Sequence, residues 1–307
     1  MSIRWLQAAV AVAVLLWQQP TRAQVAPQPA RQLAYTNSTA LRINPQALAN
    51  INVTSYRLRL YESASDVAAQ NFVGVGLSSM FTPAFARVGP IVEIQPLTIL
   101  NLFASYEGYG YFGTFDLLAS FPSAASEYGP DQLDELDGEA ELGSQLTLGA
   151  TLQLKAGPFA VRSELRMMRP DFTLPDGQRV LYDQQYDMLV ADGGWMLNND
   201  VSAVWLSDFG LVAGLRYSFT DAYYRDEDFL PGEDPGPADD NRLQRLGAIV
   251  AYTLDRTPGG RYSRPTLLLI AQWHLEHRYR TGQQVSRALP LLALGFQFRG
   301  DLLDGGR

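Results

Sequence analysis

The sequence predicts an all-β protein, a transmembrane antiparallel up-and-down β-barrel of about twelve strands, within a range of about ten to fourteen. Three observations lead to this prediction. Long segments alternate between apolar and polar residues, which is the pattern of a strand with two different faces. Trp, Tyr and Phe recur toward the ends of these segments. Short turns and long polar connections also alternate along the chain, as in membrane barrels with turns at one end and loops at the other.

Residues 266–279 form the clearest predicted strand. Its odd positions, which include Leu269 and Trp273, form an apolar stripe, and its even positions end in polar residues such as Gln272 and His274. The segment is longer than the roughly five or six residues typical of strands in soluble proteins. It matches the roughly 9–11 residues that a tilted strand needs to cross a bilayer, with some overhang. We therefore interpret it as one transmembrane strand.

The same alternation recurs from residue 52 onward, although Gly and Pro interrupt it in the first half of the chain. The predicted strands are 52–61, 71–80, 85–95, 98–107, 109–119, 142–155, 159–168, 194–206, 209–222, 243–255, 266–279 and 288–299. An even number of strands leaves both ends of the barrel chain on the same side of the membrane.

Alternation alone does not distinguish a membrane barrel from a soluble, lipocalin-like barrel, whose apolar face points inward. The strand lengths, the aromatic strand ends and the Gly, Ser, Thr, Gln and paired charges of the polar face favour the membrane barrel. Closure follows, because an open sheet edge in lipid would leave backbone groups without partners. The side chains predicted to face lipid are Leu148, Leu152, Trp205, Leu215, Tyr217, Tyr252, Leu269, Trp273, Leu294, Phe296 and Phe298.

The first 23 residues have the pattern of a cleaved signal peptide. Arg4 supplies a positive charge, residues 5–17 an apolar core, and residues 21–23 a small-residue cleavage site. A retained membrane anchor is the weaker alternative, because the apolar core is shorter than the about 20 residues that a spanning helix needs. Residues 24–50 are predicted as a periplasmic leader or plug segment, and residues 51–307 as the barrel.

The composition limits the classes of partner. Removal of Arg4 and Arg22 with the signal peptide takes away two positive charges and changes the formal net charge from −8 to −10. Such an acidic chain argues against nucleic acid as a partner, since binding to phosphates needs a basic face. The chain has no Cys, so neither disulfides nor a lipidated N-terminus are available. No cofactor is expected.

The chain resembles Gram-negative outer-membrane β-barrel proteins, from the signal peptide to the final strand. Leu292, Leu294, Phe296 and Phe298 resemble the C-terminal assembly signal of that family, although Phe298 is followed by further residues. The resemblance implies export to the outer membrane, contact with outer-membrane lipid and lipopolysaccharide, and insertion by the barrel-assembly machinery. It also implies that the chain ends lie in the periplasm.

Charged residues on the polar face are the strongest candidates for function. The predicted pore-lining residues are Arg57, Arg59, Glu107, Arg162, Glu164, Arg166, Asp200, Arg216, Arg245 and Glu276. Charges at bilayer depth are tolerated inside a barrel, paired or hydrated. They could line a water-filled channel that favours anions, or form a salt-bridged interior that seals the barrel. Twelve strands leave a wider interior than the eight-stranded barrel that side chains fill, which favours the channel.

Two further groups of residues suggest weaker possibilities. His274 could act as a general base if a serine on another strand came within reach, and His277, three residues later, is expected on the opposite face. Carboxylates in two acidic segments could bind Ca²⁺, but their spacing is not that of a known calcium loop, so solvated loop surface is favoured. The metal-ligand candidates are Asp131, Asp134, Asp137, Asp226 and Asp228.

Three classes of function remain open at this point. The leading hypothesis is porin-like passive diffusion of small polar solutes. The alternative is a non-conducting structural or adhesive barrel that acts through its acidic extracellular loops. A lipid- or peptide-hydrolysing barrel that uses His274 is the third.

Overall fold

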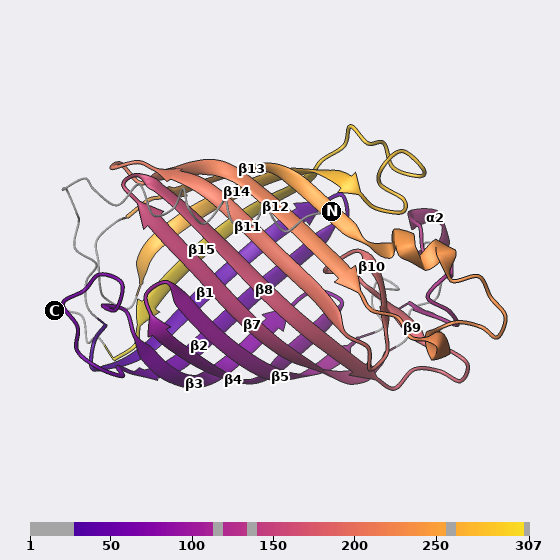
Figure 1. Ribbon diagram of the computed structural model, residues 1–307, viewed down its shortest axis with the longest axis horizontal. Coiled ribbons are helices and arrows are strands. Elements are labelled where there is room, and N and C mark those ends of the chain that lie inside the picture. The colour runs from indigo at the N-terminus through magenta and orange to yellow at the C-terminus, as the bar shows by residue number, and fades with distance from the viewer. Residues whose placement is uncertain (1–27, 113–118, 134–139, 256–261, 304–307) are drawn as a thin grey trace, which may run out of the picture.

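The computed structural model describes residues 28–112, 119–133, 140–255 and 262–303. Within these residues, twelve antiparallel strands form a closed barrel (Figure 1). The barrel strands are β1 (Arg31–Ile43), β2 (Ala47–Leu58), β3 (Phe72–Phe81), β4 (Phe85–Leu97), β5 (Leu100–Tyr111), β7 (Leu142–Ala156), β8 (Phe159–Phe172), β11 (Met196–Leu206), β12 (Leu211–Ala222), β13 (Leu243–Thr253), β14 (Ser263–Glu276) and β15 (Leu291–Asp301). The predicted all-β fold and closed antiparallel barrel are confirmed. The predicted signal peptide lies outside the described residues.

The barrel closes between its first and last strands. β1 pairs with β2 on one side and with β15 on the other, so that Thr39 lies opposite both Asn50 and Phe296. Every barrel strand therefore has a hydrogen-bonded neighbour on each side. Such a ring has no open edge, and its backbone polar groups are satisfied without water.

The strands at the start of the chain differ from the prediction. The segment 24–50, predicted as a leader or plug, contains β1 and the beginning of β2, so the barrel begins at Arg31 rather than at residue 51. Conversely, the separate strand predicted at 109–119 is wrong at its start, because β5 runs without a break from Leu100 to Tyr111. Residues 113–118 lie outside the described part of the chain. The predicted number of strands was therefore right for partly wrong reasons.

β1 was missed because its outward face lacks a continuous apolar stripe. Asn37 and Thr39 occupy the middle of that face, and Asn50 and Asn52 occupy the matching positions of β2. Asn50 donates a hydrogen bond to Thr39 at 2.7 Å, and Asn52 donates to Asn50 at 2.7 Å. These side chains satisfy one another across the two strands. Periodicity in hydrophobicity cannot detect a strand whose two faces are both polar at mid-length.

Most of the outer wall exposes large apolar side chains. Leu215 is 59% exposed and Leu294 is 57% exposed, and so many exposed large apolar side chains together are unusual in a soluble protein. Nine of the residues predicted to face lipid are likewise exposed: Leu148, Leu152, Trp205, Leu215, Tyr252, Leu269, Trp273, Leu294 and Phe296. The other two are partly covered, since Tyr217 donates a hydrogen bond to Gln244 and the ring of Phe298 packs against Tyr35.

Connections of different length lie at the two ends of the barrel. The turns 98–99, 157–158 and 207–210 lie at one end, here called the short-turn end, although the longer connection 59–71 lies there too. The connections 112–141, 173–195, 223–242 and 277–290 lie at the other end, here called the long-loop end, at the right of Figure 1, together with the short turns 44–46 and 82–84.

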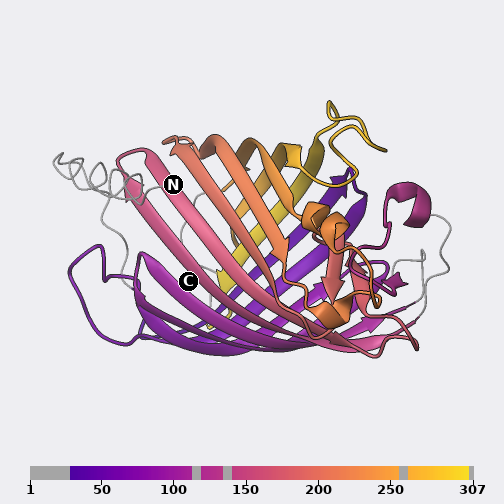
Figure 2. The ribbon, with the colours of Figure 1, turned by 45° about the vertical axis from the view of Figure 1, so that its right-hand side comes forward.

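The long loops form a small folded layer of their own. A three-stranded sheet combines β6 (Ser120–Phe121), β9 (Val180–Asp183) and β10 (Met188–Ala191). The short helices α2 (Pro130–Leu133), η1 (Asp226–Asp228) and η2 (Gly236–Asn241) lie at the same end (Figure 2). Tyr128, Val180, Leu189 and Tyr279 belong to an apolar core within this layer. No helix among the described residues is long and apolar enough to span a membrane.

Candidate functional site

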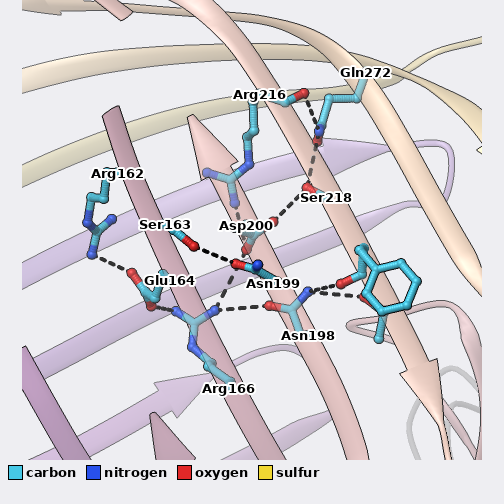
Figure 3. Close-up of polar contacts among 12 residues, drawn as sticks. Arg162, Ser163, Glu164, Arg166, Asn198, Asn199, Asp200, Arg216, Ser218 and Gln272 are labelled. Atoms are coloured by element: carbon cyan, nitrogen blue, oxygen red, sulfur yellow. Dashed lines mark hydrogen bonds and ion pairs between the residues drawn. The ribbon is translucent and has the colours of Figure 1, made fainter. Parts of the chain in front are cut away.

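A chain of ion pairs crosses three neighbouring strands of the inner wall (Figure 3). Glu164 on β8 pairs with both Arg162 and Arg166 of the same strand. On β11, Asp200 pairs with Arg166 at 3.7 Å and with Arg216 of β12 at 2.8 Å. Three guanidinium groups and two carboxylates are thus held in one network on the inner wall.

The strand register explains why these charges meet. Asp200 lies opposite Glu164 on one side and opposite Ser218 on the other, so all three side chains share the inner face. Ser218 donates a hydrogen bond to Asp200 at 2.6 Å, and Gln272 of β14 donates to Ser218 at 3.1 Å. The network therefore continues from β12 to one further strand, β14, as neutral hydrogen bonds, and the bond from Ser218 holds Asp200 in place.

A second group of ion pairs lies on the inner wall formed by β2 to β5. Arg57 pairs with Glu93 at 3.1 Å, and Arg87 approaches Glu107 at 3.8 Å. Arg87 also donates a hydrogen bond to the hydroxyl oxygen of Tyr109 at 2.8 Å. The inner wall is therefore polar on both sides of the barrel, as the sequence predicted for Arg57 and Glu107.

Two residues predicted to line the pore lie elsewhere. Arg59 follows the end of β2, in the connection 59–71, where it pairs with the exposed Glu62 at 2.5 Å. Glu276 accepts a hydrogen bond from Gln244, whose own side chain accepts one from Tyr217 of the outer face.

A β-bulge moves Glu276 off the inner face. Arg245 lies opposite His274, but Gln244 lies opposite Glu276, so β14 uses one extra residue between these two pairs. The bulge reverses the alternation after Leu275. His277 consequently faces the lumen with His274, their ring centroids being 5.4 Å apart. The expectation that the two histidines lie on opposite faces is therefore wrong.

The inner wall also borders a cavity of about 170 Å³. Four guanidinium groups line it, from Arg42 on β1, Arg166 on β8, Arg216 on β12 and Arg245 on β13, together with a single carboxylate, that of Asp200. Arg245 is 8% exposed, and its Nε and Nη1 atoms have no hydrogen-bond partner among the described residues. The cavity is therefore rich in positive charge.

The turn between β9 and β10 forms one side of this cavity, through Gln185 and Tyr186. Arg42 holds this turn by donating hydrogen bonds to the backbone oxygens of Gln184 at 2.7 Å and Gln185 at 2.8 Å. The Tyr186 hydroxyl also lies 3.3 Å from the sulfur of Met168 on β8. The hairpin thus enters the barrel from the long-loop end and contacts opposite sides of its wall.

Asp187 anchors the hairpin at the end of the same turn. It accepts hydrogen bonds from Tyr182 at 2.6 Å and from Arg280, and its carboxylate lies 3.1 Å from Nε2 of His277. Nδ1 of His277 accepts a hydrogen bond from the Tyr279 backbone at 3.0 Å, which leaves Nε2 as the donor toward Asp187. Burial alone would raise the pKa of Asp187, but His277 and Arg280 hold it well below its usual value.

The arrangement around His274 does not assemble a hydrolytic pair. Neither ring nitrogen of His274 has a hydrogen-bond partner among the described residues. Of the serines on other strands, Ser163 donates to Asn199 on the outer face, and Ser218 donates to Asp200.

The acidic segments likewise do not gather around a metal position where they are described. Asp134 and Asp137 lie outside the described residues. Asp131 lies in the first turn of helix α2, and Asp228 pairs with Arg225 at 3.3 Å. In the described part of the chain, no three His, Asp or Glu side chains are grouped as metal ligands.

Five charged residues of the site were not identified from the sequence: Arg42, Arg87, Glu93, Asp187 and Arg280. Arg42 lies in the segment interpreted as a leader, so its strand and its inward face were not recognised. Asp187 and Arg280 lie in connections, where no periodicity indicates the direction of a side chain. Their pairing joins segments 93 residues apart. The only signal in the sequence was the polarity of these connections, which is common in solvated loops.

Comparison with known proteins shows similarity only at the level of solved structures. No family model matches the sequence, and no curated protein matches it. The KdgM porin is 5% identical, with 87% of this chain and 98% of that chain covered and a TM-score of 0.39. The translocator domain of the autotransporter NalP from Neisseria meningitidis is 12% identical, with 97% and 94% covered and a TM-score of 0.37. The outer membrane protein OprD from Pseudomonas aeruginosa is 10% identical, with 89% and 92% covered and a TM-score of 0.28. At such identities and TM-scores these matches carry no statement about function, and the barrel rests on its own closed ring of strands.

Proposed function

We propose that this protein is a channel of the bacterial outer membrane that lets small polar solutes diffuse through its lumen. The observation that carries the proposal is the inner wall, where ion pairs and neutral hydrogen bonds line the barrel while large apolar side chains cover its outside. Charged side chains at membrane depth are expensive unless they face water or one another. A hydrated lumen provides that environment, and a lumen lined with charged groups can conduct ions.

The outer wall supports the membrane location. Apolar residues such as Leu215 and Leu294 are exposed around the barrel. Exposing them to water costs free energy, and contact with lipid removes that cost. Outer-membrane lipid and lipopolysaccharide are then the surroundings of the barrel. The barrel-assembly machinery would insert it through β15, the strand that closes the ring with β1.

A sealed barrel that acts through its loops is the second candidate. It is favoured by the folded layer at the long-loop end, with its own buried core, and by the β9–β10 turn inside the barrel. In that case the ion pairs would serve stability alone. A hydrolase has no comparable support, since neither ring nitrogen of His274 has a hydrogen-bond partner among the described residues.

Single-channel recording distinguishes the first two candidates. The chain without its first 23 residues would be refolded and inserted into planar bilayers, with folding checked by heat-dependent migration in gel electrophoresis. A channel gives stable open currents and a reversal potential that shifts in a salt gradient. A folded barrel that stays silent would rule out the channel and favour the sealed barrel.

A further inference from the structure

We propose that the cavity beside the β9–β10 turn is a binding site for an oxyanion, the carboxylate or phosphate group of a small anionic solute, with Arg245 as its principal ligand. The inference deepens the proposed channel function and rests on it, because the solute has to reach the lumen.

Arg245 provides the first argument. Its side chain is buried, and two of its nitrogen atoms lack any partner in the part of the chain that the structure describes. A buried charged donor without an acceptor is strongly unfavourable, and an acceptor entering the cavity would remove that cost. The planar guanidinium fork matches the two oxygens of a carboxylate or phosphate.

The balance of charge around the cavity provides the second argument. Arg42 makes its hydrogen bonds to the neutral carbonyl oxygens of Pro45, Gln184 and Gln185, and it donates to no carboxylate among the described residues. Arg166 and Arg216 share the one carboxylate that lines the cavity, Asp200. An anion is therefore attracted, whereas a cation would meet four guanidinium groups.

The size and surroundings of the cavity match a single anionic group. Its volume of about 170 Å³ is comparable with the roughly 150 Å³ of an engineered cavity that binds benzene. The Tyr186 hydroxyl accepts a hydrogen bond from the Gln185 side chain at 3.2 Å, and among the described residues it donates only to the weak acceptor Met168, so it is a further donor on the lining of the cavity. From the cavity, the ion-paired residues Asp200, Arg166 and Glu164 lead along the wall to Arg162 (Figure 3).

Anion binding can be measured without conduction. Isothermal titration calorimetry on the refolded protein in detergent micelles would use inorganic phosphate and succinate as probes, at constant ionic strength. We expect saturable binding of at least one probe, weakened about tenfold or more in Arg245→Met, because a charge-assisted hydrogen bond is lost. Arg245→Lys keeps the charge without the fork and should give an intermediate affinity.

The matched control is Arg162→Gln. Arg162 is also an inner-wall arginine, but its side chain is about half exposed and lies outside the cavity lining. Its replacement should change the affinity less than about twofold, since no bond to the anion is lost. If Arg245→Met does not fold, loss of affinity in folded Arg245→Lys supports the site, and an unchanged affinity contradicts it.

The outcomes separate this inference from the channel function. Anion binding that depends on Arg245 in a protein that conducts no ions would support the site and refute the channel. A conducting protein that binds neither phosphate nor succinate would overturn the site and leave the channel intact. Binding that Arg245→Met leaves within about twofold would likewise overturn the site.

Discussion

Asp187 and Arg280 form a buried ion pair that joins the turn after β9 to the segment after β14. Arg280 also donates a hydrogen bond to the side chain of Asn44, between β1 and β2, at 2.8 Å. Three connections of the long-loop end thus meet at one point. This contact fixes the position of the β9–β10 turn. Because the turn enters the barrel, its position affects how much of the lumen is open.

Asp187→Asn should loosen the hairpin. The substitution leaves Arg280 and His277 without their carboxylate, and removal of one partner of a buried pair costs on the order of 3 kcal/mol. We expect a lower midpoint of unfolding and, if the barrel conducts, a larger or noisier current. Glu62→Gln is the control, because the Glu62–Arg59 pair is exposed and should contribute little. Equal currents and equal unfolding in wild type and Asp187→Asn would contradict this role.

Acid should weaken the same contact. The pKa of Asp187 is lowered in the folded protein, so its contribution to stability is fully present above the unfolded value of about 3.9. It is lost as the pH falls through the lower, folded value, because the unfolded chain binds the proton first. Unfolding midpoints measured from pH 7 to pH 2 should therefore fall below about pH 4. The fall should be shallower in Asp187→Asn, and parallel curves for the two proteins would speak against the prediction.

Glu164→Gln should make the inner wall more positive. Glu164 bridges Arg162 and Arg166, and without its charge both guanidinium groups lose an ion pair. We expect a reversal potential shifted toward anions and a free energy of unfolding lower by about 1–3 kcal/mol. Glu62→Gln again serves as the control, since it removes one carboxylate outside the barrel wall. An unchanged reversal potential in a conducting protein would show that this network does not set selectivity.

Two glycines of the barrel should respond differently to alanine. A Cβ atom on Gly247 of β13 would lie 1.9 Å from the backbone oxygen of Ala271, whereas one on Gly108 of β5 would come no closer than 3.9 Å to its nearest neighbour, the Val88 oxygen. Neighbouring strands approach most closely at the first position, so Gly247→Ala should cost about 1–3 kcal/mol. Gly108→Ala should stay within about 0.5 kcal/mol. Urea unfolding of both variants tests this, and a similar loss at both positions would be contrary to it.

The barrel itself could be predicted because its main signal is local. In the second half of β14, the alternation of Ala271, Trp273 and Leu275 with Gln272 and His274 indicates which side chains face lipid and which face the lumen, without reference to any other strand. Alternation failed to predict the structure where side chains depend on residues that are distant in the chain. Hydrogen bonds between β1 and β2 satisfy Asn37, Asn50 and Asn52, and the bulge after His274 shows no distinct pattern in the sequence.

The sequence by itself determined the class of fold, the strands with an apolar outer face, and most of the charged residues on the inner wall. Only the tertiary structure decided that Arg42 joins that wall, that Glu276 leaves it and that the β9–β10 turn enters the barrel. The physical reason is the range of the interactions. Side-chain alternation is fixed by neighbouring residues, whereas the cavity around Arg245 arises from strands and a loop that are distant in the chain and meet only when the ring closes.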